Sequence, residues 1–196
     1  MGVDLLPSFI RTHYEVHETN HSCAILKEDF RSEWCDLVSM LTEFRLLEDY
    51  IRTRGGNKSK VSRFIDSYLY GRGWSEKEFA TSVVVDGRES DQPTHKIDCF
   101  RNRVALEIEW NNKDPFYDRD LNNFRLLFDL RAVSVGIIIT RADDLQEIFN
   151  RLDRGESYGA STTHMSKLLP RLQGGGGGGC PILVFGITSS LFVPGE

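Results

Sequence analysis

The sequence predicts an α/β fold in which a central mixed β-sheet is flanked by helices, and three observations support this fold class. The apolar run Val133–Thr140 is typical of a fully buried central strand. The segments His95–Phe100 and Val104–Trp110 are rich in β-branched and aromatic residues and flank a polar turn, which indicates a β-hairpin. Apolar residues recur at helical spacing in residues 30–53 and 115–130, so we expect a helix over each range.

The length of 196 residues favours one domain that buries its own core. Within residues 1–196 we expect a mainly helical N-terminal part over residues 1–75 and a core with the sheet over residues 80–190. A composition of 40% hydrophobic and 27% charged residues is ordinary for a soluble globular protein. No apolar run reaches the ~18 residues that a membrane span needs. The four cysteines are scattered without a C-x-x-C pair, which favours a reducing cytoplasm over a disulfide framework or a zinc site.

The N-terminal part contains two weak strand patterns, at His13–His17 and at Cys23–Lys27. The long helix over residues 30–53 presents an apolar stripe, and the pair Gly55–Gly56 is expected to end it. A second helix is expected over residues 59–70, where apolar residues again recur at helical spacing. The N-terminal part should therefore be built mostly from two helices.

After the second helix we expect a strand over Thr81–Asp86 and a polar loop over Gly87–Pro93 that leads to the hairpin. Asp114 and Pro115 are suited to the N-cap and the first turn of the helix over residues 115–130. The polar face of that helix should carry Asp118, Asp120, Asn122 and Arg125. The remaining elements are a helix over residues 143–152, a helix that reaches Leu169 and stops at Pro170, and a strand over Ile182–Ile187.

The hairpin carries three carboxylates, which belong to Asp98, Glu107 and Glu109. Side chains alternate between the two faces of a strand, so Glu107 and Glu109 share one face. The other face is apolar and should lie in the core, with Leu106, Ile108 and Trp110. If the turn places Phe100 opposite Arg103, Asp98 lies opposite Ala105 and points to the same face as the two glutamates.

Three acids on one face beside the small residue Ala105 are what a divalent cation site with oxygen ligands needs. Without a cation, the like charges would repel one another and raise the pKa values of the carboxyl groups. The alternative is that Glu107 and Glu109 form the solvated face of a half-exposed hairpin. Spacing alone favours this alternative.

The sequence context of the acids favours the cation site. Asp-x8-Glu-x-Glu among apolar residues resembles the PD-(D/E)xK nuclease core, and it is similar to type II restriction endonucleases of the BglII/BstYI group with a BamHI-like third acid. The order of further segments resembles that group over most of residues 30–190. These segments are GRGW at 71–74, RVALEIEWNNKDPFYDRDLNNFRLLFDL, VSVGIIIT, GESYGAS at 155–161 and GGCPILVFGI at 178–187. Two positions depart from the general motif, because Ile97 replaces its proline and Glu109 replaces its lysine.

The resemblance implies a restriction-endonuclease-like fold and a prokaryotic, Mg²⁺-dependent enzyme. Such an enzyme hydrolyses double-stranded DNA at a short palindrome and leaves 5′-phosphate ends, and by analogy the palindrome contains GATC. It implies that Asp98, Glu107 and the backbone carbonyl of Ile108 bind Mg²⁺. Glu109 would then hold or deprotonate the attacking water, or contact a second metal. The resemblance also implies a symmetric homodimer, and the helices over 30–53 and 115–130 are candidates for the dimer interface.

Residues that contact DNA must be sought elsewhere in the sequence, since the net charge of −5 is unusual for a nucleic-acid-binding protein. The stretch Arg52–Arg63 is basic and contains no acid, so it is either a phosphate-contacting segment or a solvated loop; its candidates are Arg52, Arg54, Lys58 and Lys60. Candidates for base contacts are Asn111, Asn112, Lys113, Ser161, Thr162, Thr163 and His164. The alternative for these residues is that they only form a turn and cap a helix. Gly174–Gly179 lacks the Lys-Ser/Thr of a P-loop and is either a flexible connection or a loop that approaches DNA.

Three other functions compete with a restriction endonuclease. A repair or structure-specific nuclease would have the same fold but prefer branched or damaged DNA. A catalytically silent DNA-binding module would gain by losing the three acids, because acids repel phosphates. Glycoside hydrolysis is disfavoured, since carboxylates two apart on a strand lie side by side and do not flank a bond.

Overall fold

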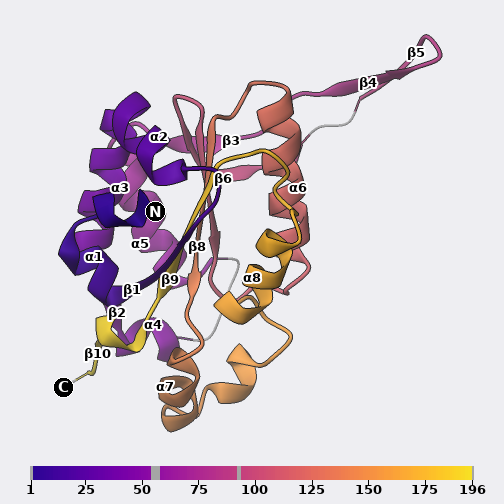
Figure 1. Ribbon diagram of the computed structural model, residues 1–196. Helices are drawn as coiled ribbons and strands as arrows, with labels where there is room; N and C mark the ends of the chain where they lie inside the picture. The colour runs from indigo at the N-terminus through magenta and orange to yellow at the C-terminus, as the bar shows by residue number, and fades with distance from the viewer. Residues whose placement is uncertain (1, 54–57, 92–93, 196) are drawn as a thin grey trace.

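The computed structural model describes residues 2–53, 58–91 and 94–195, and a six-stranded mixed sheet runs through its centre (Figure 1). The strands follow the order β1-β9-β8-β7-β6-β3, in which β7, β8 and β9 are parallel and the other pairings are antiparallel. The bounds are β1 Tyr14–Glu18, β9 Ile182–Ile187, β8 Val135–Arg141, β7 Val104–Glu109, β6 Ile97–Arg101 and β3 Ser75–Lys77. The predicted α/β class with a central mixed sheet is confirmed.

Helices cover both faces of the sheet, and each face has its own hydrophobic cluster (Figure 1). One face carries α1 Ser8–His13, α2 Ser22–Asp29, α3 Arg31–Glu43 and α5 Lys60–Tyr70; the other carries α6 Phe116–Asp129 and α8 Met165–Gln173. Side chains of β7 alternate between the two clusters, so that Leu106 and Ile108 join the first and Ala105 joins the second. All six residues of β7 are buried. The predicted core face of Leu106, Ile108 and Trp110 is confirmed.

Several short elements complete the described part of the chain. They are η1 Gly2–Leu5, β2 Leu46–Leu47, α4 Glu48–Arg52, β4 Ser82–Val85, β5 Arg88–Asp91, α7 Leu145–Arg151, η2 Gly155–Tyr158, η3 Ser189–Leu191 and β10 Phe192–Val193. Figure 1 shows β4 and β5 as a hairpin that projects away from the sheet. Within the described residues, no helix is both long and apolar enough to span a membrane.

The predicted continuous helix over residues 30–53 was wrong, because the chain leaves the helical conformation at Phe44. Phe44 adopts φ −59° and ψ 137°, and its side chain is only 1% exposed. Leu46 then pairs with Phe192 in a parallel two-stranded sheet, and the separate helix α4 follows. Long-range pairing and burial of Phe44 outweigh the local helical pattern. The expected stop at Gly55–Gly56 lies outside the described residues.

The other predicted elements met different outcomes. The strand at His13–His17 is confirmed as β1 and the helix over 59–70 as α5, but Cys23–Lys27 lies in the helix α2. Part of the expected loop Gly87–Pro93 instead pairs as β5 with β4. Helices near 115–130 and 143–152 and the strands near 133–140 and 182–187 are confirmed as α6, α7, β8 and β9.

Two expectations near the C-terminus also changed. Pro170 does not stop α8 but lies inside it, since a proline removes only its own N–H donor while buried Met165 and Leu168 hold the helix on the core. The run Gly174–Gly179 forms successive turns, in which the Gly176 N–H donates to the Arg171 carbonyl over 2.9 Å. A Cβ at Gly178 would lie 2.6 Å from Arg125 of α6. The run is therefore packed closely against α6.

Candidate active site

The turn of the β6–β7 hairpin positions the first two carboxylates. Asn102 and Arg103 have φ values of 45° and 69°, as a type I′ hairpin turn requires. Arg101 therefore pairs with Val104, and Phe100 pairs with Ala105. The expected pairing of Phe100 with Arg103 was wrong. The turn residues with positive φ are Asn102 and Arg103, so the turn lies one residue further along the chain than expected. Continuing the observed register brings Asp98 to Glu107.

Asp98 and Glu107 are linked through the backbone of the hairpin. The Ile108 N–H donates to Asp98 Oδ2 over 2.9 Å, and the Asp98 N–H donates to Glu107 Oε2 over 3.3 Å. The second oxygen of Glu107, Oε1, is buried and has no hydrogen-bond partner within residues 2–53, 58–91 and 94–195. The structure thus brings Asp98 next to Glu107 and to the backbone N–H of Ile108, whereas the ligand predicted at Ile108 is its carbonyl.

Asp98 and Ile108 line a cavity of about 360 Å³. Four basic residues also line it: Lys58, Lys60, Arg63 and Arg154. Lys58 forms an ion pair with the buried Asp66 of α5. Burial by itself would lower the pKa of Lys58, but the hydrogen bond to Asp66 and the charge of Asp98 raise it, so Lys58 stays positively charged. The cavity therefore offers positive charge next to the Asp98 carboxylate.

Glu107 and Glu109 are each 1% exposed, so the alternative of a solvated acidic face was wrong. Glu109 Oε2 accepts a hydrogen bond from Asn112 Nδ2 over 2.9 Å, and its Oε1 lies 3.3 Å from Arg119 Nη2. Arg119 also pairs over 2.8 Å with Asp120, which is fully buried on α6. The two glutamates are thus enclosed between β7 and α6.

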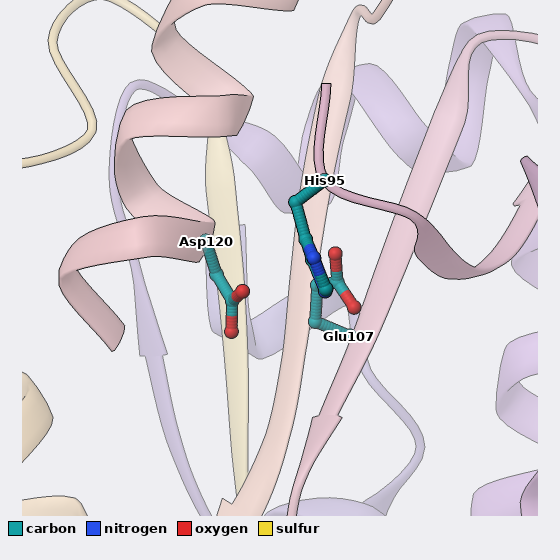
Figure 2. A group of neighbouring side chains, drawn as sticks. All are labelled: His95, Glu107 and Asp120. Atoms are coloured by element: carbon teal, nitrogen blue, oxygen red, sulfur yellow. The ribbon is translucent and has the colours of Figure 1, made fainter. Parts of the chain in front are cut away.

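The sequence interpretation missed His95, Arg119 and Asp120. Figure 2 shows His95, Glu107 and Asp120 converging from three segments, and one ligand atom of each lies within 4.8 Å of the others. Asp120 was placed on the polar face of its helix, which was wrong. It follows the buried Tyr117 by three residues and precedes the buried Phe124 by four, so helical spacing carried the signal.

Burial raises the pKa values of all three carboxyl groups. It raises the pKa of Asp98 to about 6. Burial, and next the charge of Asp120, raise the pKa of Glu109 to about 9 and place that of Glu107 well above its usual value. Carboxyl groups that are buried this close together need either protons or a cation to offset their charges.

The predicted base-contacting residues lie on two loops that are joined to each other. Asn111 and Asn112 line the cavity, and the exposed Lys113 forms an antiparallel backbone β-bridge with Thr162. Thr163 is fully buried, and its hydroxyl accepts a hydrogen bond from the Asn112 N–H over 3.2 Å. Its side chain therefore supports the Asn112 loop and does not reach the surface.

The other candidates for DNA contact also have internal partners or lie at the surface. Ser161 is exposed, the Thr162 hydroxyl accepts from Arg141 Nη2 over 2.7 Å, and His164 Nδ1 lies 2.7 Å from the Thr162 carbonyl. Arg52 pairs with Glu48 and Lys60 pairs with Asp49. Arg54 lies outside the described residues.

A mixed sheet between helices, with an acidic hairpin beneath a basic cavity, defines this chain as a protein of the restriction-endonuclease-like class. The family model "Restriction endonuclease BglII/BglIII" matches residues 14–187, so the chain belongs to this family. It is a type II site-specific deoxyribonuclease, and its substrate is DNA. No curated protein matches the sequence.

Proposed function

We propose that this nuclease hydrolyses phosphodiester bonds of double-stranded DNA at a short palindrome, depends on Mg²⁺ and leaves 5′-phosphate ends. The observation that carries the proposal is the hydrogen-bonded link of Asp98 to the Ile108 N–H and to Glu107, at a hairpin where Asp98 and Ile108 line the basic cavity. By analogy with the family, the palindrome contains GATC.

The residues at the hairpin fit a Mg²⁺ ion. Asp98, Glu107 and the Ile108 carbonyl would hold it, since Mg²⁺ prefers oxygen ligands and retains water. The buried Glu107 Oε1 has no hydrogen-bond partner in the described part of the chain, so it is available as a ligand atom. When bound, Mg²⁺ neutralises charge on the phosphoryl group and lowers the pKa of bound water.

Glu109 would hold or deprotonate the attacking water. The hydrogen bond from Asn112 and the ion pair with Arg119 fix the orientation of its carboxylate. Its raised pKa makes the ionised group a strong proton acceptor. A contact of Glu109 with a second metal remains the alternative role.

We assign phosphate contacts to Lys58 and Lys60, which line the cavity, and to the exposed Arg52. Base contacts are assigned to the two joined loops, with Asn111, Asn112, Lys113, Ser161, Thr162 and His164 as candidates. Thr163 positions the first of these loops. A negative overall charge is compatible with DNA binding because the positive side chains gather around the cavity.

We further propose that the enzyme is a cytoplasmic homodimer with one active site for each strand of the palindrome. All four cysteines are free thiols, in keeping with a reducing compartment. Of the two candidate dimer interfaces, α6 is favoured, because Phe116 and Leu126 on it and Leu130 at its C-cap are 37%, 41% and 57% exposed.

The test is digestion of sequenced, unmethylated plasmid DNA with Mg²⁺ or with EDTA. Discrete fragments that appear only with Mg²⁺ are expected, and sequencing their ends gives the site, the stagger and the position of the phosphate. Asp98→Asn and Glu107→Gln should each abolish cleavage but retain DNA binding in a mobility-shift assay. Asp29→Asn, which alters an exposed carboxylate at the end of α2, is the matched control and should cut normally.

Three outcomes would contradict the proposal. Cleavage at the normal rate by Asp98→Asn or Glu107→Gln would show that these carboxylates do not bind the catalytic ion. Cleavage confined to branched or damaged DNA would indicate a structure-specific nuclease, and binding without cleavage of any DNA would indicate a silent binding module.

A further inference from the structure

A second group of side chains meets on the α6 side of Glu107. His95 comes from the segment before β6, Glu107 from β7 and Asp120 from α6 (Figure 2). One ligand atom from each residue lies within 4.8 Å of the other two, which is close enough for one ion to contact all three. The three residues come from separate segments, so only the packing of α6 across β7 creates the group.

Two buried oxygens in this group have no hydrogen-bond partner among the residues that the structure describes. They are Glu107 Oε1 and Asp120 Oδ2, on residues that are 1% and 0% exposed. Leaving such atoms buried and unpaired costs free energy, so each is suited to act as a ligand atom. Arg119 offsets only part of the charge, because it contacts Glu109 and the other oxygen of Asp120.

The group is accessible and held in place. His95 is exposed, so an ion can reach the imidazole from solvent. Asn123 of α6 donates through Nδ2 to the His95 carbonyl over 3.3 Å and ties the segment to the helix. The imidazole therefore forms the outer side of a site whose inner side consists of the two buried carboxylates.

The donor set selects the kind of metal. One imidazole nitrogen and two carboxylates suit Mn²⁺, Co²⁺ or Zn²⁺, whereas Mg²⁺ prefers oxygen ligands alone. We propose that His95, Glu107 and Asp120 form a second divalent-cation site, selective for transition metals, that shares Glu107 with the Asp98 site. The shared carboxylate is the sole link to the proposed function, and the site itself rests on its own geometry.

Titration of the metal-free protein with Co²⁺ tests the site, because the visible absorption of bound Co²⁺ reports its ligands without any DNA cleavage. The wild type should bind Co²⁺ with an absorption band that Mg²⁺ does not displace. His95→Gln should weaken this binding by roughly 10–100-fold or more, as loss of a metal-site interaction does. Asp98→Asn should retain the His95-dependent band.

His17→Gln is the matched control, because His17 also lies beside a carboxylate, that of Glu15, but on the edge strand β1 at the opposite end of the sheet. It should bind Co²⁺ like the wild type. Circular dichroism of each variant shows whether the fold is retained, and His95 is the informative position since its side chain is exposed.

Unchanged Co²⁺ affinity in His95→Gln would overturn the inference. Loss of the band in Asp98→Asn but not in His95→Gln would do the same, because the ion would then occupy the Asp98 site alone. If no variant or wild type cleaves DNA but the His95-dependent band persists, the proposed function fails while the second site stands. If Mg²⁺-dependent cleavage is normal and no His95-dependent band exists, the reverse holds.

Discussion

Glu109 is the residue that the proposed match to the PD-(D/E)xK motif puts at the lysine position, and its surroundings are suited to an acid. Replacement by lysine would put a second cation beside Arg119 and remove the acceptor for Asn112. We expect Glu109→Lys to lower the cleavage rate by about 10²-fold or more, the usual contribution of a general acid–base group. Single-turnover cleavage measures this, with Glu109→Gln as the isosteric comparison. Full activity of Glu109→Lys would mean that the site accepts the general family residue.

The same side chain should make metal-free stability depend on pH. The pKa of Glu109 is raised from 4.5 to about 9, so between these values the folded protein binds a proton that the unfolded chain has lost. The free energy of unfolding should therefore fall as pH rises from about 5 to 9 in EDTA. Glu109→Gln should weaken this fall, with Tm at pH 9 higher by several degrees than in the wild type, at roughly 2–4 °C per kcal/mol. Parallel Tm profiles for the two proteins would refute this.

At the scale of elements, the approach of α6 to β8 depends on a missing side chain. A Cβ at Gly136 of β8 would lie 2.6 Å from the Phe124 ring of α6, closer than real contacts allow. Gly136→Ala should therefore destabilise the fold by about 1–3 kcal/mol, as overpacking does, and should shift Asp120 and Arg119 away from the glutamates. Urea unfolding measures the change. Gly179→Ala is the control, since its Cβ would lie 3.5 Å from Phe128 in ordinary contact; equal stability of both variants would contradict the argument.

At the scale of the whole molecule, we propose that residues 1–196 form one domain. The two hydrophobic clusters lie on opposite faces of one sheet, and β7 contributes side chains to both. Neither cluster can lose its packing without disturbing the sheet, so unfolding should be one cooperative transition. Fluorescence of the three tryptophans and far-ultraviolet circular dichroism should give coincident urea midpoints. Two separate midpoints would show that residues 1–75 form an independent unit.

Assembly is the second property at this scale. Leu126 in the last turn of α6 and Leu130 at its C-cap are 41% and 57% exposed, and they are four residues apart in sequence. The double change Leu126→Asp and Leu130→Asp should shift the protein from dimer to monomer in light scattering and slow cleavage at least ~10-fold, because a buried apolar contact becomes charged. Val84→Asp on the projecting hairpin, where Val84 is 64% exposed, is the control. Dissociation by Val84→Asp alone would show that the dimer interface lies at that hairpin and not at α6.

The amino-acid sequence alone was enough to predict the α/β class, the hairpin with Asp98, Glu107 and Glu109, the buried strands and the helix over 115–130. These features follow from local alternation, helical spacing and apolar composition, which hold wherever the segment lies in the fold. The family resemblance supplied the function, and the family match confirmed it as a nuclease.

The break at Phe44, the burial of Thr163 and the surroundings of Glu107 could not be predicted from the sequence, because each depends on packing between distant segments. Leu46 leaves the helical path because Phe192, far along the chain, pairs with it. His95 and Asp120 reach Glu107 because α6 packs across β7, and a polar residue on a helix cannot show by spacing alone which carboxylate it will meet. Contacts between segments far apart in sequence depend on packing, and packing depends on the whole chain.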